Sequence, residues 1–161
     1  MGGEQRALIQ LGERVFPIFR AILVAKDVQD REISRMFGTL AEMKADRSQF
    51  LEHVIAGLSN ESAGVRGAAV QLLAQIGSTR DTAPIVALLS DKEWTNSISA
   101  AKTLAAIGDR RALAAVDIWL NSSSPRQHDG DKLSEQLRKH VTKYRDELRQ
   151  RLEKEKKSPG K

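Results

Sequence analysis

The chain has 161 residues, of which 40% are hydrophobic and only 4% aromatic, and it contains no cysteine. This length allows one domain with a sizeable core, and the lack of cysteine excludes disulfide bonds and thiolate metal sites. The net charge of +5 is unevenly distributed: residues 1–125 hold 14 Lys+Arg against 14 Asp+Glu, whereas residues 126–161 hold 12 against 7. A uniformly basic surface for nucleic acid is therefore not expected over residues 1–125.

The first copy of a repeated pattern begins near the amino end of the chain. Helices are expected near 4–11 and 13–24, with Gly12 at the turn between them and the apolar run VFPIFRAILVA in the second. Arg20 interrupts this run, which is also much shorter than the roughly 20 residues that a membrane span needs. Since no signal peptide is visible either, we expect a cytoplasmic protein without membrane association.

Three further copies follow at nearly constant spacing. Their helix pairs are expected at 30–44 and 47–57, at 61–76 and 80–89, and at 92–107 and 110–120. The turns fall at Ala45, Gly77 and Gly108, and together with Gly12 they are 33, 32 and 31 residues apart. Because glycine takes the left-handed conformation without steric cost, we expect Gly77 and Gly108 to end their helices in that conformation. One such pair cannot bury its apolar face alone, so neighbouring pairs should stack.

Two segments of the third and fourth copies resemble a known family. They are VRGAAVQLLAQIG, which ends at Gly77, and ISAAKTLAAIG, which ends at Gly108. An Ala/Leu-rich helix, a short charged turn and a second helix resemble the HEAT-like repeats of the phycobilisome-lyase type. The resemblance covers residues 8–121 and implies an all-α fold, an α-α superhelix (HEAT-like solenoid) of about four helix pairs. The fourth copy departs from the family pattern, because Trp94-Thr95-Asn96-Ser97-Ile98 stands where a Val-Arg pair is usual.

The C-terminal segment differs in composition from the repeats. We assign residues 1–121 to the array, 122–130 to a loop rich in Ser, Pro, Gly and Asp, and 158–161 to a disordered end. Residues 131–157 predict a long basic amphipathic helix. Its narrow apolar stripe consists of Leu133, Leu137, Val141, Tyr144, Leu148 and Leu152.

Three roles are open for this C-terminal helix. It could cap the last repeat, form a seam for self-association, or serve as a basic arm for nucleic acid or an anionic surface. The capping role is favoured, because a solenoid exposes its core at each end. A monomer is accordingly expected rather than a homo-oligomer.

Arginines follow the predicted turns closely. The candidates for partner binding are Arg14, Arg47, Arg80, Arg110 and Arg111, together with the aromatic Trp94. Stacking of the repeats would align the arginines along one edge. There they would cap carbonyl groups or pair with Asp46, Asp81 or Asp109, which is the favoured interpretation. The functional alternative is a strip that binds acidic peptides or phosphates, and Trp94 is interpreted first as a packing residue.

No pattern in the sequence indicates catalysis. His53, His128 and His140 lie in different predicted elements, and no glycine-rich phosphate loop or nucleophile motif is present, so no catalytic, cofactor-binding or metal site is expected. We therefore interpret the chain as a non-catalytic HEAT-repeat scaffold for protein–protein interaction. The first copy of the repeat looks shortened at its amino end, which would fit a fragment of a larger chain. The first alternative is a nucleic-acid-binding module that uses the arginine edge and the basic C-terminal helix. A lyase-like or glycosylase-like enzyme is the third.

Overall fold

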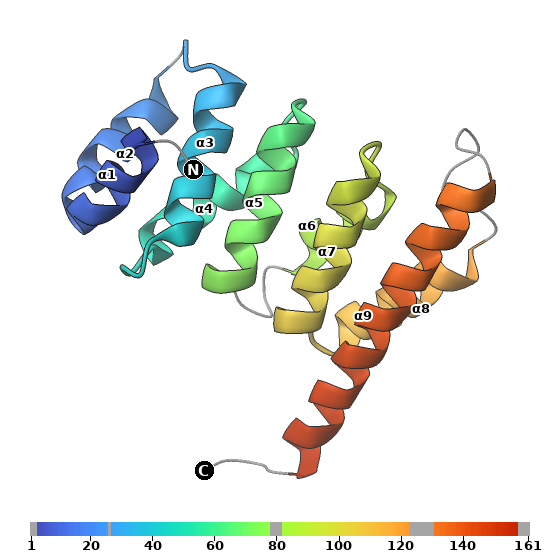
Figure 1. The fold of residues 1–161 in the computed structure, drawn as a ribbon. Helices are drawn as coiled ribbons and strands as arrows, with labels where there is room; N and C mark the ends of the chain where they lie inside the picture. Colours follow the sequence, from blue (N-terminus) through green and yellow to red (C-terminus); the bar gives the residue numbers. More distant parts are fainter. Residues whose placement is uncertain (1–2, 26, 78–81, 123–130, 158–161) are drawn as a thin grey trace. The chain divides into compact units, whose positions relative to one another are not determined.

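The computed structural model describes residues 3–25, 27–77, 82–122 and 131–157, and for residues 131–134 it describes the backbone alone (Figure 1). Every regular element in these ranges is a helix, and none of these helices is long and apolar enough to cross a membrane. The chain divides into two compact units, Met1–Gly77 and Ser78–Lys161. The predicted disordered end, 158–161, and most of the predicted loop, 123–130, lie outside the described residues.

The first unit consists of stacked helix pairs, as expected for a HEAT-like fold. Its elements are α1 (Gly3–Leu11), the 3-10 turn η1 (Gly12–Val15), α2 (Phe16–Val24), α3 (Asp30–Glu42), η2 (Ser48–Phe50), α4 (Leu51–Gly57) and α5 (Ala63–Ile76). Helix α5 packs against both α3 and α4 and buries Val65, Leu72 and Leu73 completely. The apolar positions at helical spacing thus form the core of this unit.

The end of the first unit that carries α1 is thinly packed. No residue of α1 is buried, although α1 contacts α3. The rings of Phe16 and Phe50 meet edge to face, with centroids 5.1 Å apart, and so hold α2 against η2. The first repeat is therefore anchored through α2.

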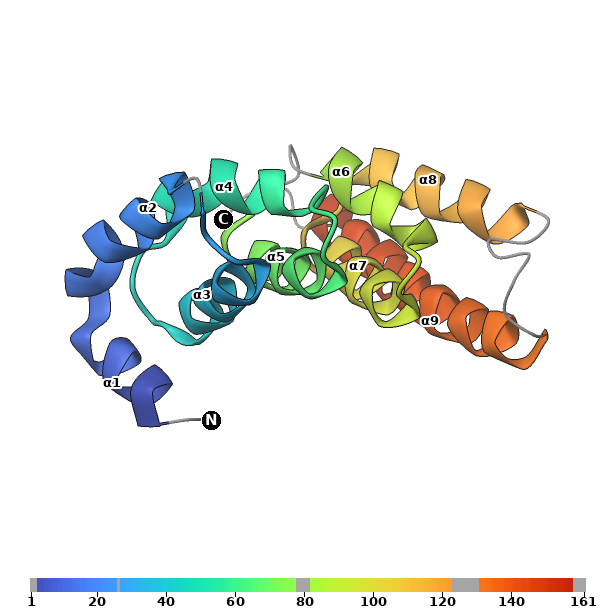
Figure 2. The same cartoon turned by 90° about the horizontal axis from the view of Figure 1, so that it is seen from above.

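The second unit repeats this arrangement and adds the long C-terminal helix. Its elements are α6 (Thr82–Ala87), η4 (Leu88–Ser90), α7 (Trp94–Ile107), α8 (Arg110–Asn121) and α9 (Asp131–Lys157). Figure 2 shows α6 and α8 in one layer of this unit and α7 and α9 in the other. Helix α9 packs against α7 and α8, as α5 packs against α3 and α4. Helix α9 therefore occupies the position of the first helix of a further repeat.

The apolar stripe of α9 faces the interior of the second unit. Leu137, Val141 and Leu148 are buried, while Tyr144 and Leu152 are half-buried. The side chain of Leu133 lies outside the described residues. The stripe is thus covered by α7 and α8 of the same chain, which is the arrangement expected of a capping helix.

Gly77 and Gly108 are the C-caps of α5 and α7 as predicted, but their predicted left-handed conformation is wrong. Gly77 and Gly108 end α5 and α7 with φ of −76° and −66°, in extended conformations. In the part of the chain that the structure describes, Gly12 is the glycine with positive φ, at 57°. A Cβ atom at Gly108 would lie only 2.4 Å from the carbonyl oxygen of Leu104, to which the Gly108 N–H donates a 2.7 Å hydrogen bond. Close approach of the backbone, rather than φ, therefore explains the glycine at this position.

Candidate functional site

The structure places the six predicted partner-binding residues in different environments. Arg14 is exposed in η1, Arg110 and Arg111 are exposed at the start of α8, and Trp94 is half-buried at the start of α7. Arg80 lies outside the described residues. Arg14 and Arg47 belong to the first unit and the others to the second. The described candidates therefore differ in exposure and in the element that carries them.

Arg47 caps the end of a helix. Its Nη1 atom lies 2.9 Å from the carbonyl oxygen of Leu40 and 2.6 Å from that of Met43, which terminate α3. The same atom lies 2.9 Å from the side-chain oxygen of Gln75 on α5. Arg47 thus binds the Met43 carbonyl and adds a second donor to the Leu40 carbonyl, which also accepts from the Met43 N–H. Helix α3 ends at Glu42, before the predicted residue 44. The Nη1 group of Arg47 is therefore occupied by contacts within the first unit.

Two arginines that sequence reasoning missed, Arg138 and Arg151, perform the same capping role, whereas Arg66 binds carbonyl groups of the loop between α4 and α5. The Nη1 of Arg66 donates to the carbonyl oxygens of Asn60 and Glu61, at 2.9 and 2.7 Å. Arg138 donates to the carbonyl oxygens of Leu120 and Ser122 at the end of α8. Arg151 donates to those of Ala105 and Gly108 at the end of α7. Two of these arginines belong to α9, so they could not be identified from their distance to a turn.

The departure of the fourth copy from the family pattern has a structural counterpart. Arg66 of the third copy bonds to the carbonyl of Asn60, six residues earlier. In the fourth copy the corresponding pair is Ser97 and Asp91, and the Ser97 hydroxyl lies 3.5 Å from the Asp91 carbonyl oxygen. The contact to the preceding loop is therefore kept with a shorter, uncharged side chain.

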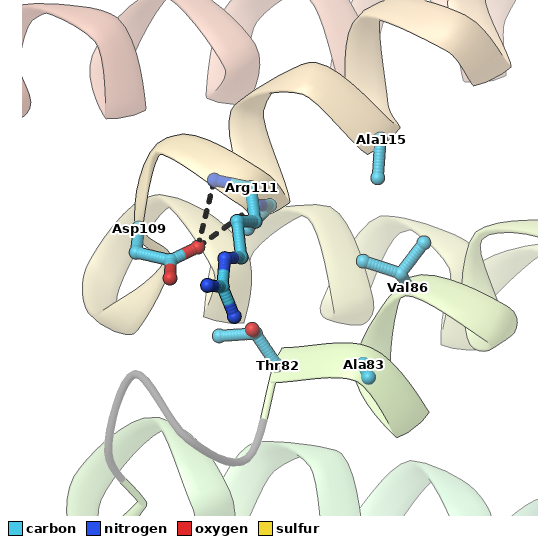
Figure 3. A pocket seen from close by; sticks show the side chains of 7 residues that line it. Thr82, Ala83, Val86, Asp109, Arg111 and Ala115 are labelled. Atoms are coloured by element: carbon cyan, nitrogen blue, oxygen red, sulfur yellow. Dashed lines mark hydrogen bonds between the residues drawn. The ribbon is translucent and has the colours of Figure 1, made fainter.

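A pocket of about 360 Å³ opens between α6 and α8 in the second unit. Its lining residues are Thr82, Ala83, Val86, Asp109, Arg111, Ala112 and Ala115. Figure 3 shows the polar groups of Thr82, Asp109 and Arg111 gathered at one end, with Val86 and Ala115 further along the pocket. The pocket thus combines one polar end with an apolar wall made of small side chains.

In the described lining of this pocket, the charged residues Asp109 and Arg111 differ in their hydrogen bonds. The Asp109 carboxylate accepts hydrogen bonds of 2.9 Å from the backbone N–H groups of Arg111 and Ala112, and it therefore caps α8. The guanidinium of Arg111 forms no hydrogen bond or ion pair with any residue that the structure describes. Among the predicted partner-binding residues that the structure describes, Arg111 is the one that lines the pocket, and its guanidinium is unpaired.

The described residues contain no group of three His, Cys, Asp or Glu side chains that could hold a metal ion. His53 and His140 lie on α4 and α9, in different units, and His128 is outside the described residues.

Comparison with known families gives one match. Residues 51–128 match the family model of HEAT repeats, a range that begins with α4 and extends past the end of α8. This family model covers HEAT repeats in general. The match therefore does not test whether the repeats are of the phycobilisome-lyase type, which stays a prediction from the sequence. No curated protein matches the chain significantly.

Proposed function

Because the chain is a HEAT-like repeat protein, we propose that it is a non-catalytic scaffold that binds another protein. Stacked helix pairs hold many side chains on a rigid support, and the exposed side chains then determine the partner. The observation that supports this proposal best is the surface of α8. Its first turn exposes Arg110 and Arg111, and Ile118 further along is 72% exposed.

The nucleic-acid alternative is weakened by the contacts of the basic residues. Arg138 and Arg151 of α9 are engaged with carbonyl groups of α8 and α7. Arg145 and Arg149 of the same helix form ion pairs with Asp117 of α8, at 3.1 and 3.4 Å. Four positive charges of the C-terminal helix are thus used inside the chain rather than offered to phosphates. A protein partner is therefore favoured, and burial of the α9 stripe favours a monomer.

Selection from a random peptide display library on the immobilised full chain tests this proposal. We expect one or more peptide families that bind in solution and slow amide hydrogen exchange in α6 or α8. The proposal fails if no peptide binds while random single-stranded oligonucleotides do so at about 150 mM salt, the physiological range.

A further inference from the structure

We propose that the pocket between α6 and α8 binds an acidic segment of the protein partner, with the guanidinium of Arg111 pairing with a carboxylate of that segment. This inference rests on the proposed scaffold function and specifies its chemistry. The apolar wall of the pocket then receives a small aliphatic side chain next to the acidic residue. The supporting observations are the composition of the pocket, the free charge of Arg111 and the position of that charge on α8.

The pocket has the size and composition of a binding site for a small chemical group. Its volume of about 360 Å³ falls near the lower end of the range for ligand pockets, which is roughly 300–1,000 Å³. Four lining side chains are aliphatic and small: Ala83, Val86, Ala112 and Ala115. Such a wall accommodates one short apolar side chain and offers it no hydrogen-bonding group. The polar end of the pocket then determines which neighbouring group is accepted.

The position of Arg111 is unfavourable for the helix that carries it. The first turn of α8 contains Arg110 and Arg111 and no acidic residue. Positive charge near a helix N-terminus opposes the helix dipole, and each such charge typically costs about 0.3–1 kcal/mol. Asp109 offsets part of this cost, but its carboxylate is directed to backbone N–H groups. A residue placed against local preference and left without a partner is expected where function selects it.

A carboxylate complements Arg111 better than a nucleic-acid backbone does. A guanidinium and a carboxylate form two parallel hydrogen bonds, and the geometry is specific for a planar anion. Binding to single strands would instead require a basic groove with aromatic side chains for base stacking, and the described lining of the pocket contains no aromatic residue. An isolated acidic residue next to an aliphatic one therefore fits this pocket.

Titration of the ¹⁵N-labelled full chain with a short capped peptide tests the assignment. The probe contains one Glu-Val pair in a Gly/Ser background, and the matched probe replaces Glu by Gln. We expect the Glu-Val peptide to shift the amide signals of Ala83, Val86 and Ala112 and the Nε signal of Arg111. Arg111→Gln should weaken this binding by about tenfold, because a charge-assisted pair is lost.

Arg110→Gln is the matched control, since Arg110 carries the same charge one residue away and does not line the pocket. It should change the affinity by less than about threefold, as expected for an exposed charge. Ala115→Leu, which fills the apolar wall and keeps the charge, should also weaken binding. Thermal melting of each variant verifies that it is folded.

The possible outcomes separate this inference from the scaffold function. Equal binding of the Glu and Gln probes, or equal effects of the Arg110 and Arg111 substitutions, would overturn the pocket assignment. If peptides selected on the chain bind with no change on Arg111→Gln, the scaffold function stands and the pocket assignment fails. Stronger shifts of the pocket signals by a single-stranded oligonucleotide than by the peptide would contradict an acidic protein segment as the occupant.

Discussion

The Nε atom of Arg151 donates a 3.0 Å hydrogen bond to the backbone carbonyl of Ala105, 46 residues earlier in the chain. The same guanidinium also donates to the carbonyl of Gly108, so one side chain of α9 caps the C-terminus of α7. Carbonyl groups in the last turn of a helix have no partner within the helix. Helix α9 therefore completes the second unit by supplying hydrogen bonds as well as apolar surface.

Leu148→Ala tests the contribution of α9 to stability. Leu148 is 1% exposed on the buried face of α9, and loss of such a side chain typically costs about 2–5 kcal/mol. We expect a decrease of this size in the free energy of unfolding, measured by urea denaturation. Ile118→Ala on α8, where the side chain is 72% exposed, should stay within about 0.5 kcal/mol of the parent.

Truncation after Ser122 separates the capping role of α9 from self-association. Without α9, the surfaces of α7 and α8 that it covers are exposed, so we expect a lower melting temperature and aggregation. Light scattering coupled to size exclusion should show the intact chain as a monomer. A truncated chain of unchanged stability, together with a dimeric intact chain, would show that the stripe serves association instead.

Arg47→Ala should lower stability because the carbonyl groups at the end of α3 lose their capping partner. Buried polar groups left unsatisfied typically cost about 1–3 kcal/mol, and we expect a decrease in that range from urea denaturation. Arg14→Ala, a substitution at an exposed arginine of the same unit, is the control and should have almost no effect. Equal stability of the two variants would contradict the capping role of Arg47.

Two glycines of the first unit should respond to alanine in opposite ways. A Cβ atom at Gly57 would lie 2.7 Å from Cε2 of Phe37, so Gly57→Ala has to displace a buried ring and should destabilise the unit. A Cβ atom at Gly38 would meet nothing within 4 Å, and this glycine lies inside α3. Gly38→Ala should therefore stabilise the protein by about 0.5–1 kcal/mol. Thermal denaturation should therefore show a lower melting temperature than the parent for Gly57→Ala and a higher one for Gly38→Ala.

The carboxyl groups of Asp46 and Glu135 should respond differently to salt. The pKa of Asp46 is lowered because its carboxylate accepts a 2.9 Å hydrogen bond from the backbone N–H of Ser48. The pKa of Glu135 is lowered by the hydrogen bond and the charge of Lys139, 2.8 Å away on the exposed face of α9. At about 1 M salt the charge of Lys139 is screened, so the pKa of Glu135 should rise toward 4.5 while that of Asp46 stays low.

Carbon-detected NMR titration measures both pKa values. Since folding lowers the pKa of Asp46, the stabilisation by this carboxylate is present above its ordinary pKa of 3.8 and is lost as the pH falls through the lowered value. Asp46→Asn should remove this pH-dependent contribution. A pKa of Asp46 that rises with salt as much as that of Glu135 would contradict its assignment to the backbone hydrogen bond.

Helical periodicity predicts most of the fold because it reports directly which side chains are buried. In the two Ala/Leu-rich segments, apolar residues at helical spacing such as Val65, Leu72 and Leu104 lie in the core, whereas Ile76 and Ile107 are half-buried. The predicted helices 61–76, 92–107 and 110–120 agree with α5, α7 and α8 to within two residues at each end. The ranges predicted as helices 13–24 and 47–57 begin with the 3-10 segments η1 and η2, and the range 80–89 ends in η4. Apolar spacing does not distinguish these segments from α-helix.

The candidate site was less accessible to sequence reasoning. Proximity to a turn in the sequence identifies Arg47 and Arg111 alike, although Arg47 caps α3 and the guanidinium of Arg111 is unpaired at the pocket. The distance to a turn does not indicate which groups a guanidinium contacts. The apolar wall of the pocket brings Val86 together with Ala115, and in the sequence these two residues look like ordinary helix-packing positions. Only the packing of α6 against α8 shows that they leave an open space between them.

The scaffold function is tested most directly by measuring affinity against salt concentration for a selected peptide and for a single-stranded oligonucleotide. Contact with several phosphates makes affinity fall by roughly 10³–10⁵-fold between about 50 and 200 mM salt, whereas a single carboxylate pair loses only a few-fold. The scaffold account predicts that the peptide stays bound at the higher salt concentration, with a shallow dependence, and that the oligonucleotide does not bind there. Tight oligonucleotide binding at that concentration, with no peptide binding, would contradict it.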